Sequence, residues 1–102
     1  MRIDQDQFSQ LKCLDPSGQL ESDLFKLFLK DTMEDLDHLS EEPRTRAHRI
    51  KGRASQLGLL DLQEAALNFQ SDIDQHLDHK DSLQKLIFDT KEACSFIQSK
   101  LH

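Results

Sequence analysis

The sequence predicts an all-α fold, an antiparallel up-down-up-down four-helix bundle with a short extra N-terminal helix. A chain of 102 residues is long enough for one modest hydrophobic core and too short for two, so residues 1–102 are expected to form a single domain. Only three glycines and two prolines are present, with no tryptophan or tyrosine, which disfavours a turn-rich β fold. Apolar residues recur at helical spacing, and the breaks between helical stretches are short enough to make successive helices antiparallel.

The first predicted helix is short and begins at Asp4, whose side chain can cap its N-terminus. A turn-forming Pro-Ser-Gly sequence at 16–18 ends it, and we expect it to cover one end of the bundle. A long helix follows from Leu20 to about Leu39, in which the apolar residues at helical spacing are Leu20, Leu24, Leu27, Phe28, Leu36 and Leu39. The acidic residues of its second half are expected to form a solvated face: Asp31, Glu34, Asp35 and Asp37.

The third helix is predicted from about Glu41 to Leu57. Ser40 is placed as its N-cap, and Pro43 is tolerated in its first turn. Gly58 ends it, because glycine readily adopts the left-handed conformation found just past a helix C-terminus. The buried stripe of this helix is Ala47, Ile50, Ala54 and Leu57.

The fourth helix is predicted to start with a capping box formed by Asp61 and Glu64. Its buried stripe is Leu62, Ala66, Phe69, Ile73 and Leu77. Gln70 lies at the edge of that stripe, from where it can reach a neighbouring helix. After a break around 78–81, the last helix turns inward Leu83, Leu86, Ile87, Ala93, Cys94, Ile97 and Leu101.

Composition excludes several classes of function. A net charge of −6 argues against general nucleic-acid binding, which needs a basic surface. No apolar run approaches the roughly 20 residues that span a membrane, and the N-terminus lacks the hydrophobic segment of a signal peptide. Two cysteines, Cys13 and Cys94, form no disulfide framework, and Cys94 is expected in the core. We therefore expect a cytoplasmic monomer, and Met1 favours a free-standing protein.

The residues around His48 indicate a chemical role for it. A single histidine on an amphipathic helix is usually solvated surface. Gly52, one turn later, costs about 0.8–1.0 kcal/mol relative to alanine in a helix interior, and its simplest purpose is to let a bulky group approach the imidazole. Lys51 and Ser55 lie on the same side, and Arg44 lies one turn earlier. Such a site is suited to carrying a phosphoryl group, whereas a solvated helix face equally explains Arg46, Arg49 and Arg53.

The sequence Ala-His-Arg-Ile-Lys-Gly at 47–52, followed by Ala54 and by Gly58 ten residues after His48, resembles a family motif. The family is that of histidine-containing phosphotransfer (HPt) domains of bacterial multistep phosphorelays, whose motif is Ala-His-x-Leu/Ile-Lys-Gly, then small residues, then Leu/Val-Gly. Gln70 matches a glutamine that in several members hydrogen-bonds the ring of the active histidine. The resemblance covers nearly the whole chain.

The resemblance implies a phosphorelay intermediate. His48 would accept a phosphoryl group from a receiver-domain aspartate and pass it to, or take it back from, the aspartate of another response regulator. Lys51 would stabilise the transferred oxygens, and Gln70 would hold the Nδ1 side of the ring so that Nε2 stays free. The implied partners are response regulator receiver domains and a hybrid sensor histidine kinase, with Mg²⁺ held by the receiver. The chain has no glycine-rich phosphate loop, so we expect no autonomous kinase activity, and no cofactor or metal of its own.

A receiver is expected to dock on the helix of His48 and the preceding helix. The centre of the docking face would be the exposed parts of Leu36, Leu39 and Ala47, and its rim Arg44, Lys51 and Ser55. Gly52 is also expected to contact the partner. Two alternative functions remain open. One is a helical interaction module without phosphorylation, such as an anti-sigma-like adaptor or a pseudo-HPt domain. The other is a metal-binding bundle that uses His76 and His79 with Asp72 and Asp78 nearby.

Overall fold

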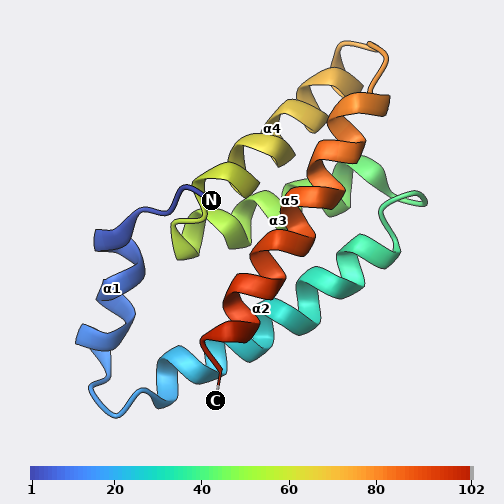
Figure 1. Ribbon diagram of the computed structural model, residues 1–102. Coiled ribbons are helices and arrows are strands. Elements are labelled where there is room, and N and C mark those ends of the chain that lie inside the picture. The colour runs from blue at the N-terminus through green and yellow to red at the C-terminus, as the bar shows by residue number, and fades with distance from the viewer. Residues whose placement is uncertain (102) are drawn as a thin grey trace.

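The structure, a computed structural model, describes residues 1–101 apart from the side chain of Lys12, and this part of the chain forms five helices (Figure 1). They are α1 (Gln5–Leu14), α2 (Gln19–Asp37), α3 (Pro43–Leu57), α4 (Leu60–Asp74) and α5 (Lys80–Ser99). The described residues contain no β-strand beyond one isolated antiparallel bridge between Ile3 and Leu59. The predicted all-α class is therefore confirmed. None of the described helices has the length and apolar character needed to cross a membrane.

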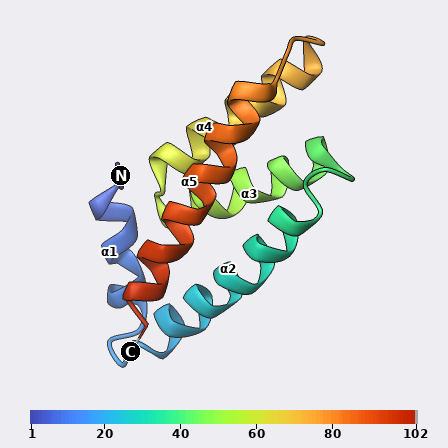
Figure 2. The same cartoon turned by 45° about the vertical axis from the view of Figure 1, so that its right-hand side comes forward.

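The four long helices pack in a ring. Helix α2 contacts α3 and α5, and α4 also contacts α3 and α5. In Figures 1 and 2, α2 and α4 run in one general direction while α3 and α5 run in the other, so neighbours are antiparallel. The short α1 packs against α2 and α3 at the end of the bundle where α2 begins. The predicted four-helix bundle with an extra N-terminal helix is confirmed.

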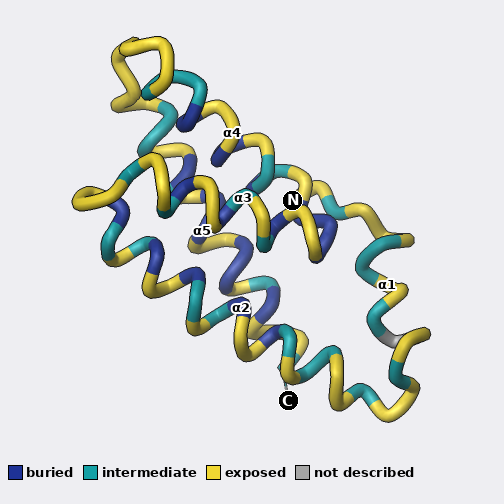
Figure 3. The backbone as a smooth tube through the Cα atoms, turned by 180° about the vertical axis from the view of Figure 1, so that it is seen from behind, coloured by how far each residue is buried: buried dark blue, intermediate teal, exposed yellow. Residues whose placement is uncertain are grey.

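Buried apolar side chains from all four long helices form the core, and Figure 3 marks their positions in dark blue. The stripe predicted for α3 is buried as expected. On α2, however, the buried residues are Phe25, Phe28, Thr32 and Asp35, whereas Leu20 and Leu27 of the predicted stripe are exposed. Phe28 and Leu39 of that stripe are buried, and Leu24 and Leu36 are half-buried. Because two of the four buried positions in α2 are polar, apolar periodicity alone identified only part of the buried face.

The start of α3 differs from the prediction. The helix begins at Pro43 with Glu42 at the N-cap position, no side chain caps it, and Ser40 lies outside it. The backbone N–H groups of Glu41 and Glu42 both donate to the carbonyl of His38 at 3.1 Å, so this segment is used by the turn after α2. Proline at the first helical position has no N–H to satisfy, which reduces the need for a capping side chain.

The predicted capping box of Asp61 and Glu64 is wrong. Leu59 is the N-cap of α4, and the two carboxylates bind Arg2 instead. Nε of Arg2 lies 2.5 Å from Asp61, and its backbone N–H also donates to Asp61 at 2.9 Å. These bonds, led by that from the Arg2 backbone N–H, lower the pKa of Asp61. They attach the N-terminal segment to the start of α4.

Gly58 ends α3 as predicted, with a φ of 71° in the left-handed region. It also allows a close approach, because a Cβ there would lie 3.0 Å from the carbonyl oxygen of Asp4. The N–H of Asp4 donates to the carbonyl of Gly58 at 2.8 Å. The side chain of Asp4 caps α1 by accepting from the N–H of Gln7 at 3.2 Å, which confirms the predicted cap.

A buried ion-pair cluster joins α2 to α3 and removes Asp35 from the expected solvated acidic face, whereas Glu34 and Asp37 are exposed as predicted. Asp35 is fully buried, with Nη1 of Arg46 at 2.8 Å and Nη2 of Arg53 in contact with its other oxygen. Nε of the half-exposed Arg49 lies 3.4 Å away. Burial lowers the pKa of Arg53 below its usual range. Arg46 and Arg53 are therefore contacts between helices and not solvated surface.

Candidate functional site

His48 is exposed on the side of α3 that faces α4. A cavity of about 450 Å³ lies between the two helices at this point, lined by Arg44, His48, Lys51, Leu67, Gln70, Ser71, Asp74 and Gln75. It brings together the three residues to which the sequence assigns chemistry, His48, Lys51 and Gln70. Arg44, predicted at the docking rim, lies in the same cavity.

Gln70 is 7% exposed, and its Nε2 lies 3.5 Å from Nδ1 of His48, at the outer limit of a hydrogen bond. Its Oε1 is buried and has no hydrogen-bond partner among the described residues. A half-turn of the amide would exchange the two atoms and leave the nitrogen without a partner instead, so hydrogen-bond satisfaction does not choose between the orientations. The two orientations differ in the tautomer of His48 that they require. If Oε1 of Gln70 accepts from Nδ1–H, Nε2 of the imidazole keeps a free lone pair, whereas a donating amide would put the ring proton on Nε2 of the imidazole.

Lys51 and Gly52 follow His48 by three and four residues on α3, and side chains on a helix lean toward its N-terminus. Lys51 therefore leans back toward His48, and it takes part in no ion pair within the described part of the chain. A side chain at position 52 would lean over His48 itself. A methyl group built onto Gly52 would meet no described atom within 4 Å outside its own helical turn, so no contact inside the domain requires glycine.

Arg44 is held across the cavity by Asp74, the last residue of α4. Its Nε lies 2.7 Å from Oδ1 and its Nη2 lies 3.4 Å from Oδ2. This hydrogen bonding, with the attraction of the two charges, raises the pKa of Arg44 and lowers the pKa of Asp74. Sequence reasoning missed Asp74, although it follows Gln70 by four residues and so lies on the same side of the helix.

The predicted apolar centre of the docking face is wrong in two of its three residues. Leu39 is 3% exposed and Ala47 is fully buried, since both belong to the core cluster. Leu36 is half-buried and lines a separate cavity of about 330 Å³ that does not include His48. Ser55 and Gly52 are exposed as expected. The large apolar side chain beside His48 is Leu67 of α4, which is 51% exposed.

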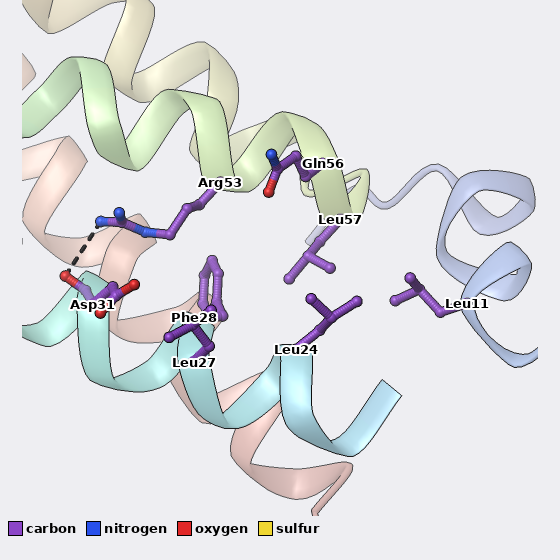
Figure 4. A pocket seen from close by; sticks show the side chains of 8 residues that line it. All are labelled: Leu11, Leu24, Leu27, Phe28, Asp31, Arg53, Gln56 and Leu57. Atoms are coloured by element: carbon purple, nitrogen blue, oxygen red, sulfur yellow. Dashed lines mark hydrogen bonds between the residues drawn. The ribbon is translucent and has the colours of Figure 1, made fainter. Parts of the chain in front are cut away.

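Another cavity, of about 470 Å³, lies between α1, α2 and α3 (Figure 4). Its lining is mainly apolar, and Nη2 of Arg53 reaches across it to the backbone carbonyl of Asp31 at 3.2 Å. Because the two cavities are nearly equal in volume, the choice between them as a functional site depends on the side chains that line them. No histidine, cysteine, serine or lysine lines the second one, and the carboxylate of Asp31 is the acidic group in its lining.

The histidines beyond the end of α4 do not form a cluster of ligands. Within residues 1–101, no three side chains of histidine, cysteine, aspartate or glutamate lie close enough together to hold a metal ion. His79 packs edge-on against the ring of Phe69, with 5.6 Å between the ring centroids. The metal-binding alternative thus has only the original two histidines in its support.

Comparison with known proteins leaves the site to be interpreted from its own geometry. No family model, no curated protein and no solved structure matches this chain. What the site offers is an exposed imidazole with one nitrogen beside a buried amide, a nearby ammonium and an open approach.

Proposed function

We propose that this domain is a phosphorelay intermediate of the HPt kind, which carries a phosphoryl group on Nε2 of His48. The group would come from the aspartyl phosphate of a receiver domain, such as that of a hybrid sensor histidine kinase, and pass to the aspartate of a response regulator. The observation that carries this proposal is the meeting of His48, Lys51 and Gln70 in one cavity between α3 and α4. The same three residues fit the family motif in the sequence.

The transfer step needs little covalent chemistry from the protein. The lone pair of Nε2 forms a bond to phosphorus while the bond from phosphorus to the aspartyl oxygen breaks, and the carboxylate leaves with that electron pair. The proton on Nδ1 stays on the ring. Oε1 of Gln70 would accept a hydrogen bond from it with the amide turned by half, since it is Nε2 of Gln70 that lies 3.5 Å from Nδ1 in the structure. The ammonium of Lys51 offsets negative charge on the phosphoryl oxygens, and Gly52 leaves their approach open.

Phosphotransfer from a panel of phosphorylated receiver domains tests the proposal. We expect an acid-labile, alkali-stable phosphoryl label on the domain that disappears in His48→Gln. His38→Gln is a suitable control, because His38 is half-exposed and its Nδ1 bonds Glu41 at 3.0 Å, away from the cavity. Label that persists in His48→Gln would contradict the assignment. A wild-type domain that binds a receiver but takes no label would favour the interaction module instead.

A further inference from the structure

We propose that Arg44 is a second phosphoryl-binding cation and that Asp74, on the neighbouring helix, is the residue that positions it. This inference rests on the proposed function of His48 and deepens it. The sequence placed Arg44 near His48 and at the rim of a docking surface, and the inference gives it a direct contact with the phosphoryl group. It also gives a role to a carboxylate that the sequence did not single out.

The direction of the His48 side chain supports this assignment. Arg44 precedes His48 by four residues, so the two side chains are neighbours on one face of α3. An imidazole on a helix leans toward the N-terminus, which here means toward Arg44. Both residues line the same cavity, and Lys51 lines it one turn farther along the helix. A phosphoryl group on Nε2 would therefore be carried between two cations.

Arg44 retains donors for such a group. A guanidinium has five N–H bonds, and Asp74 faces Nε and Nη2 only. The N–H groups of Nη1 have no hydrogen-bond partner among the described residues. One edge of the guanidinium is thus held by a carboxylate while the other edge can donate to phosphoryl oxygens. Because the side chain is already held, less conformational entropy is lost when it binds.

The contrast with the other arginines of α3 separates a binding role from a structural one. Arg46 and Arg53 are mostly buried and bind the buried Asp35, so they connect helices. Arg44 and Asp74 are both largely exposed, and exposed ion pairs contribute little to folding stability. The bond between them instead fixes the direction of one cation at the wall of the His48 cavity. The charged groups that face this cavity are Arg44, His48, Lys51 and Asp74.

The test uses the whole protein and phosphoramidate, a small donor that phosphorylates histidine without a partner protein. Nε2 forms the bond to phosphorus as the donor's P–N bond breaks and ammonia leaves. Phosphorus NMR then gives the pKa of the phosphoryl group on His48. We expect Arg44→Gln to raise that pKa by about one unit, because a nearby cation favours the dianion, and Arg44→Lys to restore part of the shift. Arg49→Gln removes the same charge from the Asp35 side of α3 and should leave the pKa unchanged.

The role of Asp74 has its own measurement, the Nε–H resonance of Arg44. It should be resolved in the wild type, should shift when His48 is phosphorylated, and should become averaged in Asp74→Asn. An unchanged phosphoryl pKa in Arg44→Gln would overturn the inference and leave the proposed function intact. The same conclusion would hold if that variant unfolded at a lower temperature but kept the wild-type phosphoryl pKa. An Nε–H resonance of Arg44 that does not shift when His48 is phosphorylated would also overturn the inference and leave the proposed function intact. Failure of His48 to take phosphate from either phosphoramidate or receivers would overturn both proposals.

Discussion

Asp35 of α2, which is fully buried, lies 2.8 Å from Nη1 of Arg46 on α3. Helix α3 contains five of the chain's thirteen basic residues and none of its acidic ones, so its orientation decides where those cations point. Asp35 binds Arg46 and Arg53 on the side of α3 facing α2. The side of α3 that carries His48 and Lys51 is then left facing α4.

Substitution of Asp35 should therefore destabilise the domain strongly. Asp35→Asn keeps the shape of the side chain but removes the carboxylate that Arg53 binds, and it leaves Arg46 paired with Glu42 at 2.9 Å. Loss of one partner of a buried ion pair costs about 3–5 kcal/mol. Urea unfolding followed by circular dichroism would measure this. Arg49→Ala, which removes a half-exposed arginine 3.4 Å from the same carboxylate, should cost at most about 1 kcal/mol. A similar small loss in both variants would mean that the cluster does not hold α3.

Two substitutions of Gly52 should distinguish its effect on the stability of the domain from its effect on the access of a phosphoryl group to His48. Gly52→Ala should stabilise the domain by about 0.8–1.0 kcal/mol, because alanine favours helix and the added methyl meets nothing. For a domain of this size that corresponds to a rise of roughly 4–8 °C in Tm. Gly52→Gln should keep much of this stability but slow phosphorylation of His48, because its side chain leans over the imidazole. If the glutamine variant is phosphorylated at the wild-type rate, glycine is not there for access.

Gln70 should set the tautomer of His48. Nitrogen NMR of the wild type should show the ring proton on Nδ1, and Gln70→Ala should shift the population toward the Nε2–H form. With loss of a hydrogen bond worth about 1 kcal/mol, phosphorylation should slow roughly five-fold. Gln70→Glu keeps an acceptor at this position and should keep the Nδ1–H tautomer. A predominant Nε2–H form in the wild type would show that the amide donates to the ring, and would remove the argument for a free Nε2.

Structural features were predicted best from the sequence at positions where the residue type has a single physical explanation. The approach of Gln70 to His48, which is found in the structure, was expected from the family resemblance. The stripe of α3 and the end of that helix at Gly58 follow from helical spacing and glycine geometry, and both are also found. These features depend on neighbours within a few turns. That is the range over which periodicity is reliable.

The parts that sequence could not predict depend on which helices pack together. A buried Asp35 looks like a solvated acid until Arg46 and Arg53 are known to lie opposite it. Alanine is so small that the sequence alone does not indicate whether Ala47 faces the core or a partner. Its burial follows only from the packing of the four long helices. Asp74 acquires its place at the site through Arg44 on another helix.

The two cysteines should differ in their effect on stability at alkaline pH. Burial raises the pKa of the Cys94 thiol above its ordinary value of 9.0, whereas Cys13 is exposed. A thiol whose pKa is raised in the folded state stabilises the fold fully below the pKa of the unfolded chain, and that contribution is lost as pH rises through the folded value. The free energy of unfolding should therefore fall less between pH 8 and pH 10 in Cys94→Ala than in the wild type. Cys13→Ala should show the wild-type pH dependence, and an equal effect of the two substitutions would contradict the burial of Cys94.

The last prediction concerns where a receiver domain docks. The partner must bring its aspartate to His48, and the cavity there lies between α3 and α4. We therefore expect the docking face to include α4 in place of α2. Leu67 is the exposed apolar side chain in this cavity, and Lys51 is a cation without an ion pair among the described residues. Transient interfaces of this kind combine a small apolar centre with a charged rim.

Chemical-shift mapping with the receiver that transfers phosphate should consequently perturb the exposed faces of α3 and α4 and leave most of α5 unchanged. Leu67→Ala should weaken binding by roughly five-fold, the effect of losing about 1 kcal/mol at the centre of an interface. Leu27→Ala is a matched control, since Leu27 is 53% exposed but lines the cavity on the α2 side of α3. Association should also slow as salt rises, because exposed charges are screened beyond about 10 Å at 0.1 M. A loss of affinity in Leu27→Ala with none in Leu67→Ala would place the docking face on α2 and remove α4 from it.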